Sequence, residues 1–391
     1  MMAFSMTMIT LLGLLSHKLF RMLRLPGLLG LLLLGMVVGP YGLNLIDQHT
    51  LAISSDLRRV ALIIILLRAG LGISRDNLAE VGPEALKLSL LPCLMEGIFV
   101  SFLAVRWLGY PLLEAGMLGF LIAAVSPAVV VPLMLGIMPD LPPGKLRVPV
   151  AILAGASFNA VIAVTILSSL IAIFLGTSTS FLWQAMSVPL SVVTGLLAGG
   201  GATWFLFWLF SRFQMRHTKK VLILIGVAVL LSEMENTLQG TLPMASLLGI
   251  VMMGFLFLEK KPETAIALSG KLSKIWVLAE IMLFVMVGAA VQFSLALQAG
   301  WLGLLLIAAG LAIRSLAVWL SLAGSSFSRK ETLFCLIANW PKATVQAAAG
   351  GLPLAAGAVF GEEILALVVL SILVTAPIGA IGIQWGSRHL L

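Results

Sequence analysis

Charged side chains are scarce in this sequence. Asp, Glu, Lys and Arg make up only 10% of its 391 residues, whereas a soluble domain carries roughly a quarter. Hydrophobic residues make up 60%, and no polar stretch is longer than a loop. The low content of charged residues and the absence of long polar stretches leave no room for a soluble domain. This composition predicts an all-α polytopic membrane protein.

Cysteine, histidine and the usual enzyme motifs are scarce or missing as well. The two cysteines, Cys93 and Cys335, lie in apolar segments, which argues against a disulfide framework. None of the four histidines lies at mid-membrane depth, so a histidine proton relay is not expected. We find no G-x-S-x-G, H-E-x-x-H, P-loop or metal-ligand spacing. The sequence therefore predicts neither an enzyme, nor a cofactor, nor a metal site.

Long apolar runs dominate what is present. With about 20 apolar residues per span, the chain divides into about thirteen segments. Their approximate limits are 3–20, 25–43, 57–74, 85–105, 111–137, 149–175, 182–210, 219–235, 241–258, 275–295, 299–322, 331–353 and 363–385. The first lacks a basic n-region and a small-residue cleavage site, which favours a retained helix over a signal peptide. Without a transit segment, a bacterial inner membrane is expected.

The basic residues predict the orientation of these spans. Nearly all of the loop Lys and Arg residues follow odd-numbered spans, and loops after even-numbered spans hold only Arg58, Arg59 and Arg106. Because basic residues concentrate on the cytoplasmic side, the N-terminus is predicted outside and the C-terminus in the cytoplasm. The net charge of +8 lies in these short loops, so it does not indicate a nucleic-acid partner.

Two predicted spans contain helix-breaking sequences. Span five reads AAVSPAVVVPLM around Ser126 and Pro127, and span twelve reads NWPKATVQAAAGGLP around Pro341 and Lys342. Proline removes a backbone donor, and the freed groups of a broken membrane helix need partners inside the protein. A pair of interrupted segments in corresponding halves of a chain is typical of a transporter's midplane site.

The two breaks belong to matching triplets of spans. Spans four to six and eleven to thirteen each contain a broken second helix, and an offset of seven spans predicts that the triplets are inverted. Glu96 and Arg314 lie in the first helices of the triplets. An unpaired charge at the bilayer centre is costly, so we expect Glu96 and Arg314 to pair. A structural ion pair and a catalytic one are both compatible with this. For Lys342 we favour neutralisation of carbonyl ends at the break over proton carrying.

These residues carry a family resemblance. LRRVALIIILLRAGLGI, SPAVVVP, GASF, NWPKATVQAA and LSILVTAPIGA occur in the order typical of the NHA branch of the cation:proton antiporter superfamily. The chain resembles that branch from about residue 57 to its end. The resemblance implies a homodimeric, lipid-embedded exchanger of Na⁺ or Li⁺ for protons with no cofactor. It also implies dimerisation or scaffold helices at 1–82 and 182–297, and core helices at 83–176 and 298–391 that move in an elevator-like cycle.

The resemblance also assigns the site, and one position departs from it. Glu96 and Arg314 match the family's intramembrane acid and base, while Ser126, Pro127, Pro341 and Lys342 match the two helix breaks. After GASF the family has two aspartates, of which the second binds cation and proton alternately. This sequence has Asn159 and Ala160 there. Asparagine at the first position occurs in electroneutral relatives, so Ala160 is the real departure.

A methyl group cannot hold a proton or a cation, and an amide does not titrate near neutral pH. Glu96 is a poor substitute if Arg314 holds it, because a neighbouring cation lowers the proton affinity of a carboxylate. We therefore predict an antiporter fold in which exchange is lost or altered. The alternatives are a carrier of the same fold for another solute or an anion, a non-transporting regulatory homologue, and an engineered inactive variant. A channel is disfavoured by the inverted triplets.

Overall fold

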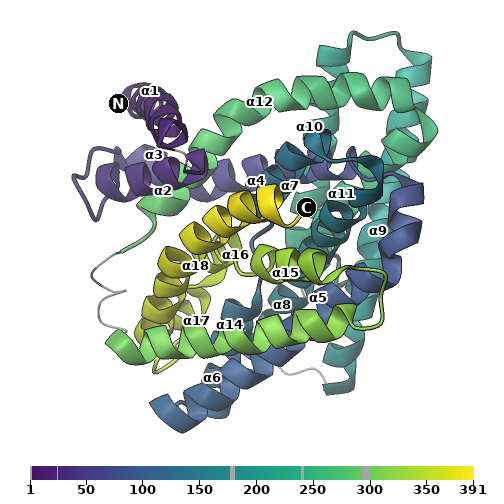
Figure 1. The fold of residues 1–391 in the computed structure, drawn as a ribbon. Helices are drawn as coiled ribbons and strands as arrows, with labels where there is room; N and C mark the ends of the chain where they lie inside the picture. Colours follow the sequence, from purple (N-terminus) through teal and green to yellow (C-terminus); the bar gives the residue numbers. More distant parts are fainter. Residues whose placement is uncertain (1, 24, 177–180, 239–241, 293, 295–299) are drawn as a thin grey trace. The chain divides into compact units, whose positions relative to one another are not determined.

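The structure is a computed structural model that describes residues 2–23, 25–176, 181–238, 242–292, 294 and 300–391. All regular elements in these ranges are helical, and Figure 1 shows them coloured along the chain. The α-helices are α1 (Met2–Met22), α2 (Gly27–Val38), α3 (Gln48–Ala52), α4 (Ser54–Gly70), α5 (Arg75–Leu103), α6 (Leu112–Ala123), α7 (Pro127–Ile137), α8 (Arg147–Phe174), α9 (Phe181–Arg212), α10 (His217–Leu238), α11 (Ser246–Lys260), α12 (Pro262–Ala289), α14 (Gly300–Leu322), α15 (Arg329–Ala338), α16 (Thr344–Ala349), α17 (Leu352–Ala355) and α18 (Gly361–His389).

The chain forms two compact units. The first comprises Met1–Arg58, Gly82–Ser178 and Ile281–Leu391, and the second comprises Arg59–Val81 and Thr179–Glu280. The first unit contains both segments predicted as core, together with residues 1–58 and 281–292, which are predicted as scaffold. The assignment of core and scaffold stays a prediction. The predicted boundary at residues 297 and 298 lies outside the described residues.

Close backbone packing explains the position of the N-terminal segment. A Cβ atom at Gly35 of α2 would strike the carbonyl oxygen of Val285 in α12, and one at Gly288 would strike the carbonyl oxygen of Leu32. Small residues let membrane helices approach to backbone contact. Helix α2 is therefore fastened to the last turns of α12, which belong to the first unit, and α1 packs on α2.

Helices α8 and α18 organise the rest of the first unit. Helix α8 packs against both α6 and α7, while α18 packs against α6, α7 and α14 to α17. A buried apolar cluster that includes Val100, Met117, Leu121, Leu306 and Leu367 ties α5, α6, α14 and α18 together. Continuous helices thus pack against both halves of each broken helix.

Both predicted helix breaks are present. Helix α6 ends at Ala123, the next residues are extended, and α7 restarts at Pro127 with Ser126 in a β conformation as its N-cap. The pyrrolidine ring disfavours helical geometry in the preceding residue, which explains the extended Ser126. In the second break, α15 ends at Ala338 and α16 begins at Thr344. By contrast, Pro132 lies inside α7 and does not interrupt it.

The second unit is built on glycine contacts between α9 and α11. A Cβ at Gly195 or Gly199 of α9 would strike the backbone of Ala245 or Gly249, respectively. Helix α10 packs on both α9 and α11. The spacing of Gly195 and Gly199 is the small-xxx-small pattern of closely packed membrane helices.

The count of thirteen spans is not confirmed. Among the described residues, eight helices are long and apolar enough to cross a membrane by length and composition. Several predicted spans fail that criterion because their helices are short, such as α2 with 12 residues. Helix α4 is also short, with 17 residues.

Candidate functional site

The two helix breaks meet through their backbones. The Ser126 N–H donates to the carbonyl oxygen of Pro341 at 2.9 Å. The Ser126 hydroxyl lies 3.2 Å from the Thr344 hydroxyl and accepts from the Thr344 N–H at 3.3 Å. Broken membrane helices leave backbone groups without helical partners, and each break here supplies hydrogen-bond partners for backbone groups of the other. The break between α6 and α7 and the break between α15 and α16 are thereby in direct contact.

Gln346 on α16 satisfies the end of α6. Its Nε2 donates to the carbonyl oxygens of Leu121 and Ala124, both at 2.8 Å. The last carbonyls of a helix have no intrahelical partner, and this amide supplies two bonds. Sequence reasoning did not single out Gln346, although a lone amide in an apolar run was the available signal.

Asn159 on α8 serves the first break from the other side. Its Oδ1 accepts from the Val125 N–H at 2.8 Å, and its Nδ2 donates to the Ser89 carbonyl oxygen at 3.2 Å. The side chain is fully buried. Both ends of the amide are therefore committed to backbone groups, which makes Asn159 a structural link between α5, α8 and the break. Ala160 is buried beside it and presents only a methyl group.

Glu96, Arg314 and Lys342 form a buried triad. Arg314 Nη1 and Lys342 Nζ both contact Glu96 Oε2, the latter at 2.8 Å, and all three side chains have 0% exposure. Arg314 Nη1 also donates to the Ala123 carbonyl oxygen, which closes α6, at 2.9 Å. Two cations on one carboxylate leave one excess positive charge in a dry environment, where charge is costly.

Lys342 thus has a different partner from the one expected. The sequence assigned it to carbonyl ends at the break, but its ammonium contacts Glu96, while Arg314 and Gln346 bind the carbonyls that close α6. Its backbone N–H donates to Thr375 Oγ1 at 3.0 Å. Thr375 belongs to the TAPIG block, and its hydrogen bond was not predicted from the sequence.

A second charged cluster lies at the start of α15. Glu331 accepts from Arg147 at 3.0 Å and Lys145 at 3.2 Å, and it completes a capping box with Ser328. Arg147 also donates to the hydroxyl and carbonyl oxygens of Ser326. This cluster has the same ratio of two cations to one carboxylate, but the Lys145 side chain is 34% exposed. Water therefore solvates its excess charge, unlike that of the buried triad.

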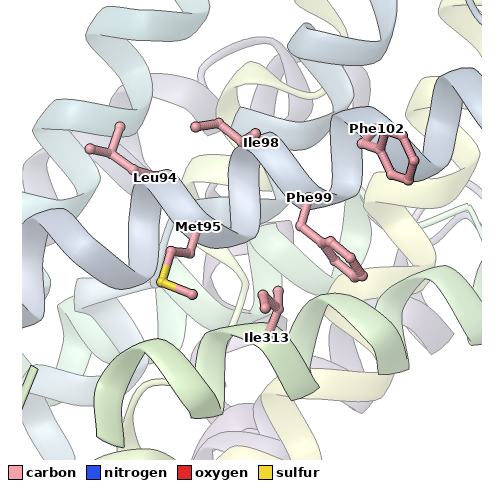
Figure 2. A pocket seen from close by; sticks show the side chains of 6 residues that line it. All are labelled: Leu94, Met95, Ile98, Phe99, Phe102 and Ile313. Carbon is pink, nitrogen blue, oxygen red and sulfur yellow. The ribbon is translucent and has the colours of Figure 1, made fainter. Parts of the chain in front are cut away.

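The structure offers little to a bound metal or polar ligand elsewhere. In the ranges that it describes, no group of three or more His, Cys, Asp or Glu residues could hold a metal ion. A pocket of about 420 Å³ on α5 and α14 is lined by Leu94, Met95, Ile98, Phe99, Phe102 and Ile313 (Figure 2). Its lining is apolar throughout, so it is no ion site, and the breaks with the triad are the candidate functional site.

Interlocked broken helices around buried charges define a membrane carrier. The sequence profile of the family "Sodium/hydrogen exchanger, transmembrane" matches residues 7–387. The chain is 34% identical to human sodium/hydrogen exchanger 9B2 over 388 residues, which cover 94% of this chain and 70% of that protein. It is 30% identical to human sodium/hydrogen exchanger 9B1 over 372 residues, covering 91% and 71%.

The fold agrees with a solved structure. The sodium proton antiporter MjNhaP1 from Methanocaldococcus jannaschii superposes with a TM-score of 0.80 at 20% identity, covering 98% of this chain and 97% of that one. The chain belongs to the sodium/hydrogen exchanger family. It is an integral multi-pass membrane protein and a secondary transporter, not an enzyme.

Proposed function

We propose that this chain is a carrier with the sodium/proton antiporter fold that lacks ordinary exchange of Na⁺ or Li⁺ for protons as its sequence stands. The observation that carries the proposal is the composition of α8. This helix contains no Asp or Glu between Arg147 and Phe174. At the two family positions it has an amide, Asn159, with both ends committed to backbone groups, and a methyl group, Ala160.

Coupled exchange needs one group for which a cation and a proton compete. The amide oxygen of Asn159 accepts from the Val125 N–H, and the amide does not titrate near neutral pH, so it cannot be the group for which a proton and a cation compete. Glu96 is the carboxylate of the buried triad. Its Oε2 is already held by both Arg314 and Lys342.

Other features of the carrier follow from the resemblance and are proposed with it. These are about thirteen spans with inverted triplets, a homodimer, an outside N-terminus with a cytoplasmic C-terminus, and a bacterial inner membrane. The described helix breaks and the family membership support them. We propose further that residues 83–176 and 298–391 move as the core, and that no cofactor is needed.

The decisive experiment restores a carboxylate at one position. Everted vesicles from a host without endogenous antiporters are given Na⁺, Li⁺ or K⁺, and proton release is followed with a pH-sensitive dye. The protein as it stands should be nearly silent, and Ala160→Asp should respond to Na⁺ or Li⁺. Asn159 is retained because an aspartate there would lose the donor to the Ser89 carbonyl. Ala160→Asp also balances the charges of Glu96, Arg314 and Lys342.

Ala160→Asn is the matched control, because it adds a polar group of the same size that does not titrate. It should remain silent in vesicles that contain equal amounts of folded protein. Strong exchange by the unaltered chain would overturn the proposal. Silence of Ala160→Asp would favour the non-transporting alternative or a different substrate.

A further inference from the structure

One edge of the Arg314 guanidinium has no partner within the unit that contains it. Nη1 carries both of the contacts described, to Glu96 Oε2 and to the Ala123 carbonyl oxygen. Nε and Nη2 form the other edge, and within the described part of the chain neither has a hydrogen-bond partner. The side chain is fully buried. A buried donor without a partner is destabilising, and two of them side by side on one rigid plane point to a ligand.

The charge of the triad points to the same kind of ligand. Arg314 and Lys342 share Glu96, so the three groups in their ordinary ionised forms carry a formal excess of one positive charge. The other buried carboxylates among the described residues are engaged elsewhere. Glu114 accepts a backbone N–H, and Glu331 is held by the cations at the start of α15. A single negative charge beside Arg314 and Lys342 would neutralise the cluster.

We propose that the Nε–Nη2 edge of Arg314 binds a small, planar, monovalent oxyanion, such as bicarbonate, formate or nitrate. The guanidinium presents its N–H groups as a fork that matches two oxygens of such an ion. The size of the excess charge selects a monovalent ion, since a divalent ion would leave an excess negative charge. Anion binding at this site uses Arg314 and Lys342 and needs no carboxylate on α8.

The test measures binding through stability, so it does not depend on transport. Purified protein is melted in detergent and followed by the fluorescence of its nine tryptophans. Sodium gluconate is replaced by sodium nitrate, formate, chloride or sulfate at constant sodium concentration and ionic strength. A ligand that binds only the native state raises Tm saturably, here by about 2 °C or more once its concentration is well above Kd. Nitrate and formate should do so, chloride less, and sulfate should act alike on all variants through general exclusion.

Three variants separate the site from general salt effects. Lys342→Gln removes the excess charge and should abolish the response to nitrate. Arg314→Lys keeps the charge but removes the fork, so the preference for nitrate over chloride should disappear. Lys145→Gln is the matched control, since Lys145 also pairs with a buried glutamate, Glu331, but in the partly exposed cluster. It should respond to nitrate like the unaltered protein.

Two results would overturn the proposal. One is an equal Tm for the unaltered protein in nitrate and in gluconate, which decides the matter even if variants do not fold. The other is an undiminished nitrate response in Lys342→Gln. Failure of Ala160→Asp to restore proton release would contradict the proposed function and leave this site standing, so the two proposals fail separately.

Discussion

Removal of Glu96 should be far more harmful than removal of the whole triad. In Glu96→Gln, Arg314 and Lys342 stay buried without a counter-charge. Removing one partner from a buried ion pair costs about 3–5 kcal/mol, and we expect the upper part of that range because two cations share one carboxylate oxygen. At roughly 2 °C per kcal/mol, Tm should fall by about 8–10 °C.

The rescue tests the reasoning. The triple variant Glu96→Gln, Arg314→Gln and Lys342→Gln leaves no buried charge in the cluster, so it should recover most of the loss. The assay is thermal melting of the purified protein in detergent, arranged as a mutant cycle. Glu114→Gln is the matched control. That carboxylate is equally buried but accepts from the Phe360 N–H at 2.8 Å. Its replacement therefore leaves no buried cation without a counter-charge.

Simple addition of the losses would refute the argument. If the triple variant melts lower than Glu96→Gln, the side chains stabilise the unit independently, and charge balance is not what holds them. A Glu96→Gln loss no larger than that of Glu114→Gln would lead to the same conclusion.

Three further predictions concern single hydrogen-bonding groups. Asn159→Ala leaves the buried Val125 N–H without its acceptor, so thermal melts should show a loss of about 1–3 kcal/mol. Gln346→Ala removes two bonds to the end of α6 and should cost about as much, whereas Gln346→Glu should be worse, because a carboxylate cannot donate to carbonyls. The Thr50 hydroxyl and neighbouring donors hold the pKa of Asp47 below its ordinary value of 3.8. The ionised carboxylate therefore stabilises the native state at pH values above 3.8, and this stabilisation is lost as the pH falls through the pKa of the folded protein. Asp47→Asn should accordingly show a smaller difference in Tm between pH 5 and pH 3 than the unaltered protein.

Much of the arrangement could be predicted from the sequence because it depends on local chemistry. Pro127 and Pro341 favour a break in their helices, since proline lacks an N–H and restricts its neighbour. The scarcity of charge requires a membrane. The high cost of burying a lone charge predicts that Glu96 and Arg314 pair with each other, and in the structure their side chains are in contact. That Ala160 cannot titrate is also a property of the residue alone.

The remaining features depend on which backbones meet in space. Glycine contacts join α2 to the last turns of α12, two segments that are both predicted as scaffold and that both belong to the first unit, and composition does not reveal such a pairing. The role of Gln346 follows from the approach of α16 to the end of α6. Lys342 binds Glu96 because the second break directs it there. From the sequence alone, Asn159 is an amide at a position where the family has an aspartate. The tertiary structure shows that it links two backbone segments, because the amide accepts from the Val125 N–H and donates to the Ser89 carbonyl oxygen at once.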